Sequence, residues 1–208
     1  MAETVAVRVS FPSGDLSLEG ALHVAGATPA PAVVVCHPHP QYGGDMDNNV
    51  VLAACSALAS AGITALRFNF RGVADSDGAF DQGQGEQDDV RAALAHLASL
   101  SEVDGASLGL AGYSFGAMVS AQVASDELRA LALISLPLGH GDLPTGWGCP
   151  ALVVGGDADQ IAPADRLTLI GEEPGVEVRI FPGVDHSWWG HEEELGGALA
   201  EFFQRHLR

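Results

Sequence analysis

The sequence predicts an α/β fold in which a mostly parallel, twisted sheet carries helices on both faces and begins with an antiparallel hairpin. Continuous apolar runs such as Ala32–Cys36 are typical of strands that a parallel sheet buries on both sides. Segments of helical length alternate with these runs along the chain. Before them, residues 5–9 and 16–25 alternate in polarity around a turn-rich segment at 11–15, which indicates the hairpin.

The later elements follow in regular order. Asn48 or Asn49 can cap the first helix, which runs to about Ala61, and acidic residues begin the second helix, where the helix dipole favours them. We find no repeat and no linker, so residues 1–208 are expected to form one domain. Strands are expected at 32–36, 64–68, 107–111, 128–135, 151–155 and 176–181, and helices at 48–61, 85–100, 115–125, 163–170 and 192–207.

The composition argues against several classes of partner. The formal charge is −18, and every basic residue is an arginine. Such a surface repels nucleic acid and anionic membranes. No apolar leader segment opens the chain, and Cys36, Cys55 and Cys149 are widely spaced, which fits free thiols in a reducing compartment. We therefore expect a cytoplasmic protein; the sequence does not indicate its oligomeric state.

Gly112-Tyr113-Ser114-Phe115-Gly116 stands between a predicted buried strand and a predicted helix. A serine on such a tight turn adopts a strained backbone, and glycine on both sides supplies the clearance that this requires. The turn raises the hydroxyl above the sheet edge, at a helix N-terminus that favours developing negative charge. Ser114 is therefore the predicted nucleophile.

An activated serine needs a base, and the base needs a carboxylate that orients it. His186, which follows the last strand, is the predicted base, with His191 as its rival. Asp159 is the predicted acid, with Asp157 on the same loop as the alternative. Asp185 adjoins the histidine but should point away from it, since adjacent side chains diverge on an extended chain.

A tetrahedral intermediate also needs two backbone N–H donors. The amide of Phe115, next to the nucleophile, is the first candidate. The second should come from the loop after residue 36, where Pro38 and Pro40 have no N–H, so the amide of His39 is preferred and that of Gln41 is second.

A metal site at His37 and His39 is the competing hypothesis for this loop, but two histidines with no third ligand nearby make a poor site. No metal and no organic cofactor is expected. Arg71 could bind an anionic substrate group; a structural ion pair with Asp75 or Asp89 is the simpler interpretation.

These motifs together resemble the small, lid-less α/β hydrolases related to dienelactone hydrolases and carboxylesterases. The resemblance rests on residues 37–48, on the Arg67–Val73 segment, on the serine turn and on the Asp159 and His186 loops, in order over nearly the whole chain. It implies the α/β-hydrolase fold, Ser114, Asp159 and His186 as a triad, and oxyanion donors at His39 and Phe115. Dienelactone hydrolases use a cysteine nucleophile, so a serine favours ester or thioester chemistry.

Only about fourteen residues, Leu136–Cys149, separate the strand ending at 135 from Pro150, so no cap domain fits. The site should be open, with Tyr42 and Trp188 contacting the substrate. The further aromatic residues considered as apolar walls are Phe115, Trp147 and Trp189.

The predicted function is hydrolysis of small carboxylic esters through an acyl-enzyme, with a small-molecule ester as the partner. Thioesterase, peptidase and carbon–carbon hydrolase activities share the same triad and remain alternatives. A dehalogenase would need an aspartate at position 114. The alternative outside enzymes is a non-catalytic binding protein on a hydrolase fold.

Overall fold

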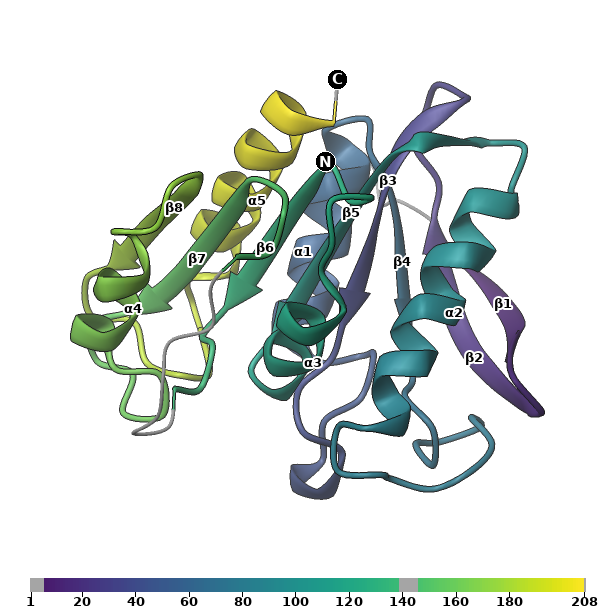
Figure 1. The fold of residues 1–208 in the computed structure, drawn as a ribbon, viewed down its shortest axis with the longest axis horizontal. Coiled ribbons are helices and arrows are strands. Elements are labelled where there is room, and N and C mark those ends of the chain that lie inside the picture. The colour runs from purple at the N-terminus through teal and green to yellow at the C-terminus, as the bar shows by residue number, and fades with distance from the viewer. Residues whose placement is uncertain (1–5, 139–145, 208) are drawn as a thin grey trace.

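The computed structural model describes residues 6–138 and 146–207. Eight strands form one sheet in the order β1-β2-β4-β3-β5-β6-β7-β8 (Figure 1). The strands are β1 (Ala6–Ser13), β2 (Leu16–His23), β3 (Ala30–Cys36), β4 (Thr64–Phe68), β5 (Val103–Tyr113), β6 (Ala130–Ile134), β7 (Ala151–Gly156) and β8 (Val176–Phe181). The helices are the single 3-10 turn Pro40–Tyr42, α1 (Asn49–Ser60), α2 (Gly85–Ser99), α3 (Phe115–Val123), α4 (Ala164–Ile170) and α5 (Glu192–His206).

The strand directions place all the candidate loops at one edge of the sheet. β1 pairs with β2 and β2 with β4 in antiparallel fashion, whereas β4, β3, β5, β6, β7 and β8 are parallel to one another. The carboxyl ends of the parallel strands therefore meet at a single rim. Ligands bind at this rim in open α/β sheets.

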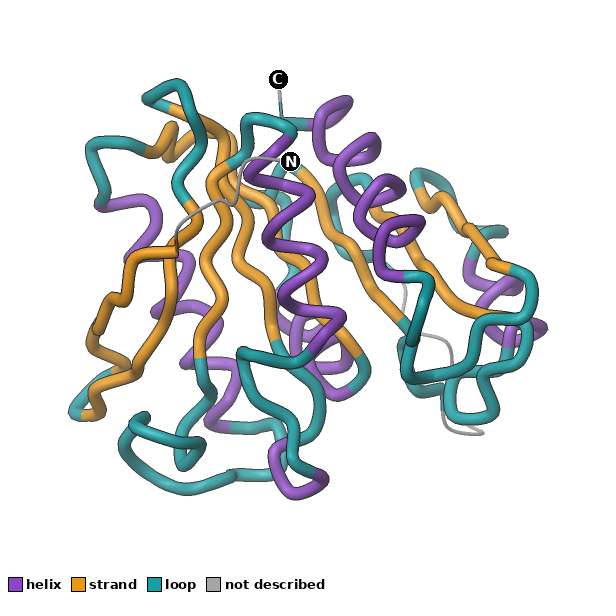
Figure 2. Tube along the Cα trace, turned by 180° about the vertical axis from the view of Figure 1, so that it is seen from behind, coloured by secondary structure: helices purple, strands orange, loops and turns teal. Residues whose placement is uncertain are grey.

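Helices cover both faces of the sheet (Figures 1 and 2). On β3, Ala32, Val34 and Cys36 pack on the side of α2, α3 and α4, whereas Val33 and Val35 pack on the side of α1 and α5. All five side chains are fully buried. This is why the strand is a continuous apolar run, and the predicted fold class is confirmed.

The boundaries differ from the prediction mainly at the sheet edge and in β5. β1 continues through Pro12, which the sequence analysis assigned to the turn; β1 is an edge strand, so a proline without an N–H is tolerated there. β5 begins at Val103, because that residue pairs with Ala30 before a register shift. Of the short connection between β6 and β7, residues 139–145 lie outside the described part of the chain.

No helix in residues 6–138 and 146–207 has the length and apolar character that crossing a membrane requires.

An ion pair between the half-buried Arg71 and the buried Asp89 ties the segment after β4 to α2. Asp89 is fully buried and accepts hydrogen bonds from the backbone amide and the guanidinium of Arg71 at 2.8–3.0 Å, and from the hydroxyl of Ser13 at 2.8 Å. The Asp89 hydrogen bonds raise the pKa of Arg71. Arg71 is thus occupied by its structural partner, as the simpler interpretation held.

Replacing Asp89 by asparagine should lower the free energy of unfolding by about 2 kcal/mol, because the half-buried guanidinium of Arg71 loses its charge-assisted hydrogen bonds. Asp88→Asn is the matched control: this neighbouring carboxylate is exposed and pairs with Arg91 on the helix surface, so little change is expected. Urea unfolding of both variants measures the difference. Equal stability of the two variants would contradict the assignment.

Candidate active site

Ser114 occupies a strained turn between β5 and α3, with φ 54° and ψ −115°. Positive φ is rare for residues with a side chain and marks turns that the surrounding structure must hold in place. A Cβ added to Gly112 would lie 2.3 Å from the carbonyl oxygen of Gly116, and one added to Gly116 would lie 2.4 Å from that of Cys36. Glycine is therefore required on both sides, as the sequence analysis reasoned.

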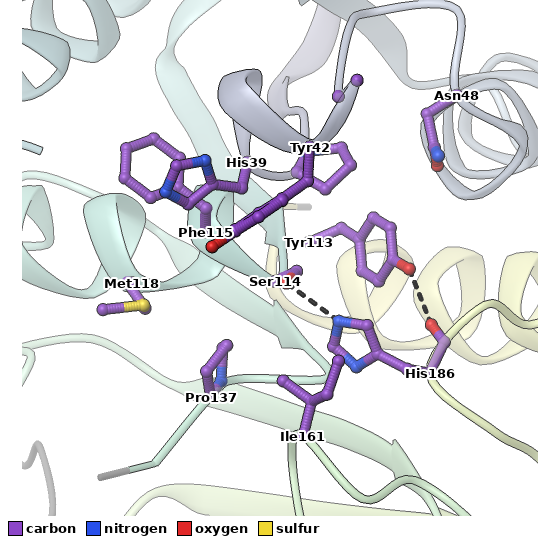
Figure 3. Close-up of a pocket in the computed structure, with 13 residues that line it drawn as sticks. His39, Tyr42, Asn48, Tyr113, Ser114, Phe115, Met118, Pro137, Ile161 and His186 are labelled. Carbon is purple, nitrogen blue, oxygen red and sulfur yellow. Dashed lines mark hydrogen bonds between the residues drawn. The ribbon is translucent and has the colours of Figure 1, made fainter. Parts of the chain in front are cut away.

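The structure brings the three predicted side chains together in one hydrogen-bonded chain. Ser114 Oγ lies 2.9 Å from His186 Nε2, and His186 Nδ1 lies 2.8 Å from Asp159 Oδ2 (Figure 3). Nδ1 donates to the carboxylate, which leaves Nε2 to accept the serine proton. This is the arrangement that nucleophilic acyl transfer requires.

Asp159, and not Asp157, orients the histidine. Its side chain is fully buried, and its second oxygen accepts the amides of Ile161 and Ala162 at 2.9 Å. Burial opposes ionisation, but the hydrogen bonds from His186 and from these amides outweigh it and hold the pKa of Asp159 below its usual value. Asp157 instead accepts the amide of Gly183 at 2.6 Å and joins the loops after β7 and β8.

Neighbouring residues hold the loop that carries His186. The Tyr113 hydroxyl, beside the nucleophile, donates to the backbone oxygen of His186 at 2.6 Å (Figure 3). The side-chain amide of Asn49 donates to the oxygen of Ser187 at 3.0 Å. Asp185 turns away from the histidine and accepts the amide and hydroxyl of Ser187. No pattern in the sequence indicates this role for Tyr113 or Asn49.

The prediction that Trp188 contacts the substrate is wrong. Its side chain is fully buried, and its indole N–H donates to Ser135 Oγ at 3.0 Å. Trp188 also has a positive φ of 60°. Trp147 is also buried, and Trp189 is exposed but lines no part of the cavity described below.

Two backbone amides near the nucleophile, those of Phe115 and His39, have no hydrogen-bond acceptor within residues 6–138 and 146–207. Phe115 is the first residue of α3, so its N–H has no partner within the helix. The amide of His39 is likewise unbonded, whereas that of Gln41 donates to His39 Nδ1 at 3.2 Å. Between the two donors that the sequence left open, the structure favours His39.

His37 is a buried structural residue. Its Nε2 accepts the amide of Phe70 at 3.1 Å, and its Nδ1 donates to the oxygen of Pro38 at 2.7 Å. Burial lowers the pKa of His37 to about 4, so the ring is neutral near pH 7. Both nitrogens are occupied, and the described residues contain no group of three or more His, Cys, Asp or Glu side chains placed to hold a metal.

A cavity of about 430 Å³ opens beside Ser114 (Figure 3). Tyr42, which the sequence predicts as a substrate contact, lines this cavity and is 88% exposed, and Met118 lies one helical turn beyond the serine. Among the described residues that line the cavity, the ionisable side chains are those of two histidines and two tyrosines. The lining residues are Pro38, His39, Tyr42, Gly43, Gly44, Asn48, Tyr113, Ser114, Phe115, Met118, Pro137, Ile161 and His186.

Solved structures of similar proteins indicate the class of protein to which the chain belongs. A lid-less α/β serine hydrolase from Xanthomonas campestris is 34% identical, with a TM-score of 0.86 over 100% of this chain and 97% of that one. An α/β serine hydrolase homologue from Coxiella burnetii is 32% identical, with a TM-score of 0.84 over 97% and 98%. The fold and these relatives define a small α/β serine hydrolase.

The family follows from the sequence. Residues 6–150 match the family model described as X-Pro dipeptidyl-peptidase (S15 family), and the chain belongs to that family within the α/β hydrolases. An uncharacterised protein from Rickettsia prowazekii is 34% identical over 94% of this chain and 87% of its own length.

The buried His37 should make the protein acid-sensitive in a defined window. Because its pKa is lowered from 6.5 to about 4 in the folded state, the unfolded chain binds the proton more tightly, and stability falls as pH drops from 6.5 towards 4. The full loss from this residue is about 3 kcal/mol.

His37→Gln provides the comparison, since the glutamine oxygen can accept the Phe70 amide and does not titrate in this range. Unfolding free energies measured from pH 7 to pH 4 should fall less steeply for this variant. The same slope in both proteins would show that His37 is not the titrating group.

Proposed function

We propose that this hydrolase cleaves small, neutral carboxylic esters through an acyl-enzyme formed on Ser114. The observation that carries the proposal is the continuous chain from Ser114 Oγ through His186 to Asp159, with both contacts at 2.8–2.9 Å. Each group has one role in acyl transfer, and the carboxylate is already ionised and desolvated.

In the first half-reaction, His186 Nε2 takes the hydroxyl proton as Ser114 Oγ bonds to the ester carbonyl carbon. The carbonyl oxygen becomes an oxyanion and accepts hydrogen bonds from the amides of Phe115 and His39. The tetrahedral intermediate then breaks its bond to the alkoxy oxygen, which receives the proton from His186 and leaves as the alcohol. Asp159 stabilises the imidazolium between these steps.

In the second half-reaction, His186 takes a proton from water as the water oxygen attacks the acyl carbon. The new oxyanion uses the same two amides. Its collapse breaks the bond to Ser114 Oγ, which recovers its proton, and the carboxylic acid leaves. Water needs direct access to the acyl-enzyme for this step, and the open cavity supplies it.

Charge favours neutral esters over coenzyme A thioesters. The cavity contains no arginine within the described residues, and the chain carries a formal charge of −18. A substrate with several phosphates would approach against this field and find no cation to pair with. The free thiols of Cys36, Cys55 and Cys149 support the further proposal that the enzyme works in the reducing cytoplasm.

The family match makes peptidase activity the second candidate. An enzyme that releases dipeptides from a free N-terminus must hold the α-ammonium group, and a desolvated ammonium needs a carboxylate or a set of acceptors. No Asp or Glu side chain lines the cavity in the described part of the chain. This favours ester substrates in this member of the family.

Ser114→Ala should lower kcat/KM for nitrophenyl acetate at least about a thousandfold, since it removes the attacking oxygen. Labelling with a fluorophosphonate, followed by peptide mass analysis, should find the adduct on Ser114 in the natural protein and none in the variant. Ser56→Ala, on the exposed face of α1, is the control and should keep both properties.

Retained ester cleavage or labelling in the Ser114→Ala variant would refute the assignment of the nucleophile. An X-Pro nitroanilide, assayed beside the ester, separates the two candidate functions. Faster cleavage of the nitroanilide, measured as kcat/KM, would replace the esterase proposal with the peptidase.

A further inference from the structure

A second hollow of about 540 Å³ adjoins the catalytic cavity. The two hollows share the wall formed by His39, Phe115 and Met118, so they are direct neighbours. Neither Ser114 nor His186 lines the second hollow. Its remaining walls are Gln41, Phe80 and Gln82.

The direction of the chemistry assigns a role to each side. Phe115 and Met118 lie on the opposite side of Ser114 from His186 (Figure 3). The alcohol oxygen must stay near His186, which protonates it, and the carbonyl oxygen must meet the amides of His39 and Phe115. The remaining substituent of the carbonyl carbon is the chain of the acyl group. This chain is therefore directed past Phe115 and Met118 towards the second hollow.

We propose, on the basis of the esterase function above, that the second hollow is the acyl subsite and that it selects aromatic acyl groups. The His39 ring centroid lies 5.0 Å from that of Phe80 and 4.9 Å from that of Phe115, and the two phenyl rings are 5.6 Å apart. Met118 adds a thioether. Aromatic rings and methionine sulfur make favourable contacts with a further ring, and no Asp, Glu, Lys or Arg side chain is among the described residues that line this hollow.

The segment that supplies Phe80 and Gln82 is held rigidly. Glu86 is fully buried, and its two carboxylate oxygens accept the amides of Asp81 and Gly83 at 2.8 Å each, on either side of Gln82. Gln82 itself has a φ of 53°. The buried carboxylate of Glu86 thus accepts two hydrogen bonds from the residues that flank the strained Gln82. These bonds keep the wall in place before substrate binds, and such preorganisation favours selective binding.

The two exposed glutamines, Gln41 and Gln82, stand at the mouth of this hollow. Their side-chain amides can donate to and accept from a polar substituent on the bound ring. The acyl group that fits this hollow is thus uncharged and aromatic, and its ring is either unsubstituted or carries hydroxyl groups.

The test compares two esters of one alcohol, ethyl phenylpropanoate and ethyl acetate. Phe80→Ala should lower kcat/KM for ethyl phenylpropanoate relative to kcat/KM for ethyl acetate at least about tenfold, since the aromatic acyl group loses a contacting ring. Trp189→Ala is the matched control: this aromatic side chain is 72% exposed and lines neither hollow, so the ratio should not change.

A second series keeps the acetyl group and varies the alcohol, with ethyl and benzyl acetate. Here the Phe80→Ala variant should show the same preference as the natural protein. The assignment would be overturned if Phe80→Ala lowered kcat/KM for benzyl acetate relative to ethyl acetate. It would also be overturned if the variant left kcat/KM for ethyl phenylpropanoate relative to ethyl acetate unchanged. If Phe80→Ala does not fold, Phe80→Leu retains apolar packing without the ring and is expected to lower the acyl ratio in the same direction.

The controls separate this proposal from the one on which it rests. A natural protein that cleaves ethyl acetate in a Ser114-dependent manner, with an acyl ratio that Phe80 does not affect, refutes the acyl subsite alone. A natural protein that cleaves none of the esters refutes the esterase function and the subsite together.

Discussion

The left-handed backbone of Ser114 is the constraint around which the rim of the sheet is arranged. A residue with φ 54° is costly, and it persists only where its surroundings leave no alternative. Here the amide of Ser114 donates to Ile134 on the neighbouring strand at 2.9 Å, and Gly112 and Gly116 allow the backbones of β5, α3 and the end of β3 to approach closely. The same turn that places Ser114 at the cavity also leaves the amide of Phe115 without an acceptor among the described residues.

Three buried carboxylates hold this edge of the molecule together in different ways. Asp159 receives two backbone amides and the imidazole of His186, so it is ionised and fixed where the base needs it. Asp89 and Glu86 are equally buried, but they join the segment after β4 to α2. One carboxylate thus orients the base, Glu86 holds the segment that carries Phe80 and Gln82, and Asp89 anchors Arg71 to α2. In each case, directed hydrogen-bond donors occupy the oxygens of a buried carboxyl group.

Most of the fold and the order of the site residues could be predicted from the sequence. Buried parallel strands are continuous apolar runs, and Gly-x-Ser-x-Gly after such a run predicts the turn at Ser114. His186 and Asp159 follow because the carboxyl ends of parallel strands share one edge. These inferences depend on backbone periodicity and chain order, both of which a single sequence displays.

Side-chain direction in irregular segments could not be predicted in this way. The sequence predicts Trp188 at the substrate, yet its backbone has a positive φ and its indole lies in the core, where it donates to Ser135. The sequence does not predict the hollow formed by Phe80 and Gln82 either, because nothing in the local pattern shows that the Glu86 carboxylate turns back to accept the amides of Asp81 and Gly83. No local pattern indicates which way a loop residue points when its backbone lies in the left-handed region.

A crystal structure of the protein after reaction with a small alkyl phosphonate tests the central claim most directly, since the adduct imitates the tetrahedral intermediate. The account predicts phosphorus bonded to Ser114 Oγ, with the phosphonyl oxygen about 2.7–3.1 Å from the amide nitrogens of His39 and Phe115. His186 should stay beside Oγ. Phosphorus on another residue, or a phosphonyl oxygen turned away from both amides, would contradict it.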